Sequence, residues 1–125
     1  MCFIVEPDFI DPPPGAPAST DACLATMAEL FPDHDSAPGE CVCADCLEEV
    51  ARCFEDAHCF RIFQCATWTG CFGTQCYQPD FCMREIDAAG VSSEAVASVT
   101  EVGNCSDSHN CPRAEPRPKP PVPGL

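Results

Sequence analysis

Thirteen cysteines in a chain of 125 residues are the feature that most constrains this fold. The large aliphatic residues and Phe are few, and a net charge of −14 opposes compaction, a combination that on its own favours disorder. Covalent crosslinks can compensate for a small core, each contributing about 2–4 kcal/mol by restricting the unfolded chain. Because cysteine-dense small domains are mostly exported, we predict disulfides and a secreted or outer-surface location.

Proline marks the boundaries of the folded part. Eleven of the fourteen prolines fall in residues 1–20 and 112–125, and such segments are typically extended. We therefore predict a Pro-rich N-terminal tether over residues 1–19, a disulfide-rich domain over 20–111 and a Pro-rich basic tail over 112–125.

Apolar residues within the predicted domain recur at helical spacing, and two-residue alternation is scarce. The spacing predicts a small, irregular all-α domain of about five short helices. These cover residues 21–31, 44–55, a segment that Asp56 caps, a segment from Pro79 to Gly90, and a segment that Ser92 caps and Gly103 ends. A loop rich in glycine and cysteine is expected over residues 70–77.

Twelve cysteines lie inside the predicted domain and are expected to form structural disulfides, several of them on the apolar helix faces. Their pairing does not follow from their spacing. They are Cys23, Cys41, Cys43, Cys46, Cys53, Cys59, Cys65, Cys71, Cys76, Cys82, Cys105 and Cys111.

The thirteenth cysteine, Cys2, stands apart from this set. If Met1 occupies the place of a signal peptide, Cys2 followed by a flexible tether has the form of a bacterial lipoprotein after processing. An intermolecular disulfide and a free thiol are the alternatives. The neighbouring apolar residues are candidates for docking on lipid, on a partner protein or on the domain itself: Phe3, Ile4, Val5, Phe9 and Ile10.

The cluster Cys41, Cys43 and Cys46 is the strongest candidate for chemistry. Its C-x-C-x-x-C spacing could supply half of a thiolate site for Zn or Cu, or a redox pair, although the βαβ context of redox catalysts is absent. His34, His58 and His109 are expected to be solvated or to cap helices. We predict structural bridges at the cluster, no catalytic residue and no cofactor.

Charge and hydropathy limit the partners. A chain with 20 acidic and 6 basic residues is not expected to bind nucleic acid, and no apolar run is long enough to cross a membrane. The acidity is expected to serve solubility, with adaptation to salt and a weak surface for calcium or a basic partner as alternatives. No small-molecule substrate is indicated.

The cysteine pattern of residues 41–112 also resembles a known group of proteins. Its elements are the C-x-C-x-x-C cluster, the evenly spaced cysteines of 53–65, the Gly70-Cys71 loop and the closing Asn104 to Pro112 segment. This pattern is similar to the small cysteine-rich lipoproteins and secreted proteins that myxobacterial genomes encode. The resemblance implies export and disulfides, and it transfers no active site.

The sequence therefore predicts a non-enzymatic, exported, surface-anchored module, crosslinked by disulfides, with a binding or structural role. A subunit of an extracellular assembly, joined through the apolar N-terminal segment or Cys2, is one alternative. A thiolate metal-binding protein is the other.

Overall fold

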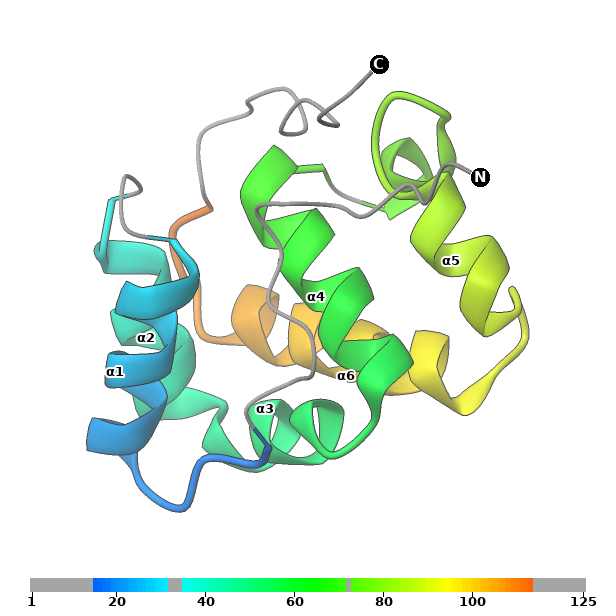
Figure 1. Ribbon diagram of the computed structural model, residues 1–125. Coiled ribbons are helices and arrows are strands. Elements are labelled where there is room, and N and C mark those ends of the chain that lie inside the picture. The colour runs from blue at the N-terminus through cyan, green and yellow to red at the C-terminus, as the bar shows by residue number, and fades with distance from the viewer. Residues whose placement is uncertain (1–14, 32–34, 72, 114–125) are drawn as a thin grey trace.

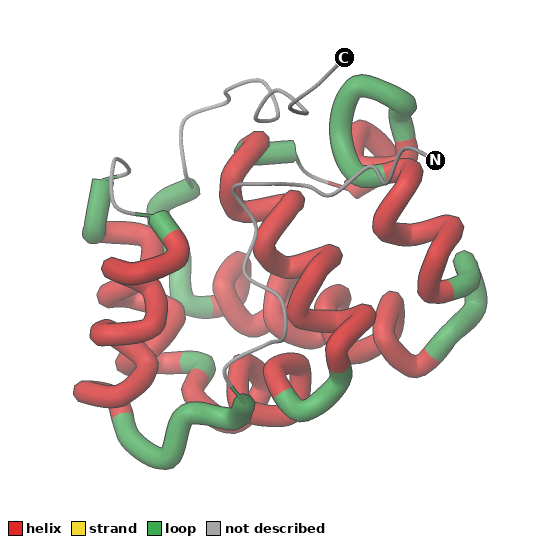
Figure 2. The backbone as a smooth tube through the Cα atoms, viewed as in Figure 1, coloured by secondary structure: helices red, strands yellow, loops and turns green. Residues whose placement is uncertain are grey.

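The computed structural model describes residues 15–31, 35–71 and 73–113. Within these ranges the chain is helical and contains no strand (Figure 2), which confirms the predicted all-α fold. No helix among the described residues has both the length and the apolar character needed to cross a bilayer. The elements are α1 (Thr20–Leu30), α2 (Ala37–Asp45), α3 (Leu47–Phe54), α4 (Ala57–Thr69), the 3₁₀-helix η1 (Gly73–Tyr77), α5 (Met83–Ala89) and α6 (Glu94–Ser108).

Helices α4 and α6 form the centre of the fold. They pack against each other, α3 packs against both, and α5 contacts α4 from the other side (Figure 1). Helices α1 and α2 lie side by side at one flank, where α2 also contacts α6. The α1–α2 pair on one flank and α5 on the other therefore both pack on the α4–α6 centre, α1–α2 through α6 and α5 through α4.

The start and end of α4 follow the sequence prediction. The Asp56 carboxylate accepts hydrogen bonds from the backbone N–H groups of His58 at 2.9 Å and Cys59 at 3.4 Å. Gly70 ends the helix in the left-handed conformation at φ 70°, which glycine adopts without strain.

Aromatic rings make up the part of the core next to α4. The Phe54 ring meets the edges of Phe60 and Phe63, with centroid distances of 5.0 and 5.1 Å. Phe31, at the end of α1, reaches the same cluster, with 6.4 Å between its ring and that of Phe63. These rings are buried, so the domain has a true hydrophobic core despite its composition.

The predicted helix over residues 44–55 is confirmed only in its later part, as α3. Residues 44 and 45 are the end of α2, and Cys46, at φ −127° and ψ 28°, interrupts the helical path between the two helices. The first of these helices begins with Pro38 in its first turn, where the missing N–H costs nothing. Periodicity could not find α2 because Cys43 is the one buried residue in it, so it has no apolar stripe.

The last helix also differs from the prediction. It begins after Ser93 rather than Ser92, and it continues through Gly103 to Ser108 instead of ending there. A glycine inside a helix costs about 1 kcal/mol relative to alanine. Helix α6 continues because Val102 is buried and because Cys105, in the next turn, is covalently held by Cys46.

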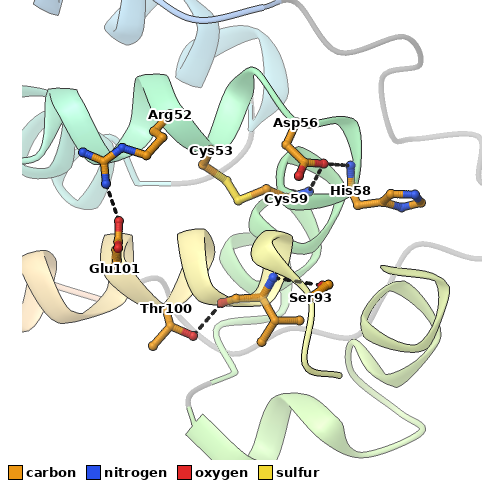
Figure 3. The surroundings of a disulfide bond; sticks show 9 residues. Arg52, Cys53, Asp56, His58, Cys59, Ser93, Thr100 and Glu101 are labelled. Carbon is orange, nitrogen blue, oxygen red and sulfur yellow. Dashed lines mark hydrogen bonds and ion pairs between the residues drawn. A yellow bond between two sulfur atoms is a disulfide. The ribbon is translucent and has the colours of Figure 1, made fainter. Parts of the chain in front are cut away.

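Six disulfides use all twelve cysteines of the predicted domain. They are Cys23–Cys43, Cys41–Cys111, Cys46–Cys105, Cys53–Cys59, Cys65–Cys82 and Cys71–Cys76. Figure 3 shows the bridge between α3 and α4, Cys53–Cys59, beside the Asp56 cap. The same view shows Arg52 of α3 reaching Glu101 of α6 in an exposed ion pair.

Candidate functional site

A pocket of about 460 Å³ lies between α1, α2, α4 and α6. Two of its walls are stripes with the i, i+3, i+4, i+7 spacing of one helix face. On α1 the stripe is Leu24, Met27, Ala28 and Phe31, and on α4 it is Phe63, Ala66, Thr67 and Gly70. Both walls are therefore mainly apolar.

The other two walls come from α6 and α2. Helix α6 supplies a third stripe of the same spacing, Val99, Val102, Gly103 and Ser106. Helix α2 supplies Pro38, Gly39 and Val42 from its first turns. A Cβ on Gly39 would lie 3.3 Å from the Cβ of Met27, so the glycine lets α1 and α2 approach closely at the edge of the pocket.

Disulfides link three of the four walls, those of α1, α2 and α6. Cys23–Cys43 joins α1 to α2, and Cys46–Cys105 joins the end of α2 to α6. Cys41–Cys111 joins α2 to the segment after α6, in which Pro112 and Arg113 line the pocket. Covalent bonds therefore hold the α1, α2 and α6 walls together, whereas the α4 wall is positioned by its packing against α6.

Charged side chains lie around the pocket, and all four are exposed. The Asp35 carboxylate accepts a hydrogen bond from the Ala37 N–H at 3.1 Å, and the Glu40 carboxylate accepts one from the Ser36 hydroxyl at 3.3 Å. The Arg113 guanidinium donates to the Asp107 carboxylate at 3.2 Å. Three carboxylates and one guanidinium therefore give the pocket a negative rim. We call Asp35, Glu40, Asp107 and Arg113 the rim.

The three cysteines proposed for metal or redox chemistry do not come together as a site. Each is bonded to a different part of the chain: Cys41 to Cys111, Cys43 to Cys23 and Cys46 to Cys105. Their sulfurs are consequently not thiolates in this structure, and thiolate is the form that binds soft metals.

Two groups of donor atoms lie close together near these bridges. One contains Cys46, Cys105 and His109, and the other contains Cys41, Asp45 and Cys111. In each group two of the three residues form a disulfide, which leaves one His or one Asp as an ordinary ligand. The His109 Nδ1 atom lies 2.9 Å from the carbonyl oxygen of Cys105, at the end of α6, in agreement with a local role at the helix end.

Of the other candidate residues from the sequence, the structure describes only His58. His58 is exposed in the first turn of α4, where its backbone N–H meets Asp56. His34, Cys2 and the apolar residues Phe3, Ile4, Val5, Phe9 and Ile10 lie outside the described residues.

Part of the pocket wall belongs to the hydrophobic core that the helical spacing predicts. Met27, Phe31, Phe63 and Val102 are buried in that core, and Ala66 and Val99 pack against it, although all six also line the pocket. Spacing shows that a helix has an apolar face, but it does not show whether the facing stripe is close enough to fill the space. The rim residues have no recognisable pattern in the sequence, because they come from separate segments.

Comparison with known proteins gives no relative for this chain. No protein-family model, curated protein or solved structure matches it.

Proposed function

We propose that this chain is a non-enzymatic, exported binding module whose disulfides hold open an apolar pocket for a ligand. The observation that carries the proposal is the pocket between α1, α2, α4 and α6, because three bridges link its α1, α2 and α6 walls. Ligand sites are typically concave, mostly apolar and largely formed before the ligand binds, with a few polar groups at defined places. This pocket has each of those properties.

The disulfides support export. Six bridges in one small domain require an oxidising compartment for formation and persistence. We further propose that Cys2 anchors the module at a membrane surface as a lipidated residue. Mass spectrometry of protein from its native host tests this point: acyl mass on Cys2 supports the anchor, and an unmodified Cys2 thiol contradicts it.

The pocket chemistry favours binding over catalysis. Nucleophilic catalysis needs a nucleophile with a base beside it. Among the described lining residues there is no histidine, and the one cysteine, Cys71, is bonded to Cys76. The Ser36 hydroxyl does donate to the Glu40 carboxylate at 3.3 Å, but both residues are exposed to solvent, and no third group is described that orients this base. The charged groups lie at the rim, where they would contact solvent and the exposed end of a ligand.

Binding of a neutral fluorescent probe, N-phenyl-1-naphthylamine, tests the proposed function. Ala28→Trp places a large side chain at an exposed position that lines the pocket, whereas Ala25→Trp makes the same change at an exposed position of α1 outside it. We expect the probe to bind the wild-type chain and Ala25→Trp equally, and Ala28→Trp at least roughly 10-fold more weakly, which corresponds to about 1.4 kcal/mol.

The variants are compared only with all six bridges intact and with the helical circular dichroism of the wild type. Ala66→Trp, on the facing wall, provides a second obstruction if Ala28→Trp folds poorly. Equal binding by the wild type and both obstructed variants, or no binding by the wild type, would contradict the proposed function.

A further inference from the structure

We infer that the pocket takes a small cationic amphiphile: a molecule with an apolar body and one ammonium or guanidinium group. This inference rests on the proposed function and adds the charge of the ligand. The apolar stripes would hold the body, and the rim would hold the positive group. Two observations indicate that the ligand is positively charged. They are the composition of the rim and the net charge of the whole chain.

The rim has an excess of negative charge. Arg113 is paired with Asp107, so its guanidinium is already engaged with a carboxylate. Asp35 and Glu40 are left with hydrogen bonds from a backbone amide and a hydroxyl, which orient the carboxylates without neutralising their formal charge. A ligand carboxylate or phosphate at this rim would meet two oriented anions and one engaged cation, whereas an ammonium group would meet complementary charge.

The net negative charge of the whole chain also favours a cationic ligand over an anionic one. With 20 acidic and 6 basic residues, the chain raises the local concentration of cations and repels anions. An amphiphilic anion such as a fatty carboxylate is therefore disfavoured both during approach and at the rim. A neutral amphiphile gains the apolar contacts but not the charge contact.

The pocket volume fits a small molecule as the source of this chemistry. A volume of about 460 Å³ lies in the range of sites that enclose a single small ligand. The walls come from three helix stripes, two of which continue into the cap residues Phe31 and Gly70, together with the start of α2, so they contact a short apolar body from four sides. We therefore assign the occupant as a free small molecule.

Three probes with the same ten-carbon chain test the inference: decyltrimethylammonium, decanol and decyl sulfate. Each is titrated below its micelle-forming concentration into the full chain with its disulfides intact, and binding is followed by calorimetry and by methyl NMR shifts of the pocket residues. We expect the cation to bind best and the anion worst, with roughly a 10-fold difference between them at low salt that shrinks at high salt, since the Debye length falls.

Glu40→Gln removes a rim charge and tests its contribution directly. We expect it to weaken the cation roughly 3-fold or more at low salt and to leave decanol unchanged, because only the charged probe senses the carboxylate. The matched control is Glu48→Gln on α3, which removes the same charge from an exposed position that does not line the pocket. It should leave the preference for the cation nearly intact.

The outcomes separate this inference from the proposed function. Equal binding of all three probes, or a preference for decyl sulfate, overturns the cationic ligand and leaves the apolar binding site standing. Absence of binding by all three, both to the wild type and to the variant with Arg117→Glu and Lys119→Glu, overturns both. If the cation binds only after Arg117→Glu and Lys119→Glu, the chain's own basic tail is the occupant of the pocket, and the inference of a free ligand is wrong.

Discussion

Helices α2 and α4 both contact α3 and α6, but they are held in opposite ways. Helix α4 buries seven of its residues, including two phenylalanines, and packs against α3, α5 and α6. Helix α2 buries Cys43 alone, yet its two cysteines and the cysteine that follows it are bonded to three different parts of the chain. Packing stabilises α4, and sulfur stabilises α2.

The bridges of the two regions also differ in reach. Those of α2 span 20, 70 and 59 residues, whereas those of α4 span 6 and 17. In the chain-entropy description, a bridge over 59 or 70 residues stabilises by about 4 kcal/mol and one over 6 by about 2 kcal/mol. Of these two helices, the one that buries fewer residues therefore carries the longer crosslinks.

The two longest bridges are nested. Once Cys46–Cys105 is closed, Cys41–Cys111 encloses a further loop of roughly 11 residues, five on the α2 side and six on the α6 side. Removal of either bridge alone is therefore expected to cost about 3 kcal/mol, because the other still closes the long loop. Their contributions should not be additive.

The largest effect is expected when both long bridges are replaced by Cys→Ser at Cys41, Cys46, Cys105 and Cys111. The free energy of unfolding should fall by about 7 kcal/mol, more than twice the cost of either bridge alone. Denaturant titration measures the loss, and amide hydrogen exchange should show α2 opening before α4. The Cys71→Ser, Cys76→Ser pair, which opens a bridge over 5 residues, is the control and should cost about 2 kcal/mol. A cost for the two long bridges no greater than that of the control would remove the distinction between the regions.

A second prediction concerns packing in the region of α4. Phe54→Ala removes a fully buried ring between Phe60 and Phe63 and should cost about 3–5 kcal/mol. Val42→Ala in α2, where the side chain is only half-buried, should cost less than about 1 kcal/mol. Thermal or chemical unfolding of the two variants measures the difference. Equal losses would show that α2 depends on its packing as much as α4 does.

A smaller change of opposite sign is expected at Gln64. Its side chain is 1% exposed, and neither amide atom has a hydrogen-bond partner among the described residues. Because an unpaired buried polar group is costly, Gln64→Leu should raise the free energy of unfolding by about 1–2 kcal/mol. Gln64→Glu, which buries a charge at the same place, should lower it. A stability loss in the leucine variant would show that the amide is paired in solution.

The smallest effect compares the two helix starts. Asp56→Ala removes the carboxylate that caps α4 and should cost about 1 kcal/mol. Ser36→Ala at the start of α2 should change stability by less than about 0.5 kcal/mol, because the Ser36 side chain makes no cap hydrogen bond there. Denaturant midpoints measured side by side are sufficient to detect this difference. A larger cost at Ser36 would contradict it.

The same contrast explains how far the sequence predicts the fold. Residues that act within one helix were predictable: Asp56 caps α4, Gly70 ends it, and the apolar stripe of α1 is buried as its spacing indicates. Helix α2 was not, because bonds to distant cysteines hold it and these leave no periodic pattern. The twelve domain cysteines were expected in bridges, but the pairing depends on which helix ends meet in space.

The pocket was less predictable than the fold. The stripes of α1, α4 and α6 were visible as apolar helix faces, but the gap between them depends on helix positions that the long bridges set. Arg113 and Asp35 meet the pocket from loops far apart in the chain. Neither has a neighbour in the sequence that indicates a site.

The most direct test of the central claim, that sulfur bonds hold α1 and α2 on the rest of the domain, is non-reducing peptide mapping of the native protein by mass spectrometry. We expect Cys41 linked to Cys111, Cys46 to Cys105 and Cys23 to Cys43, with no alkylatable thiol among these six residues. Free thiols at these positions, or pairing confined to neighbours within the 41–46 cluster, would contradict it.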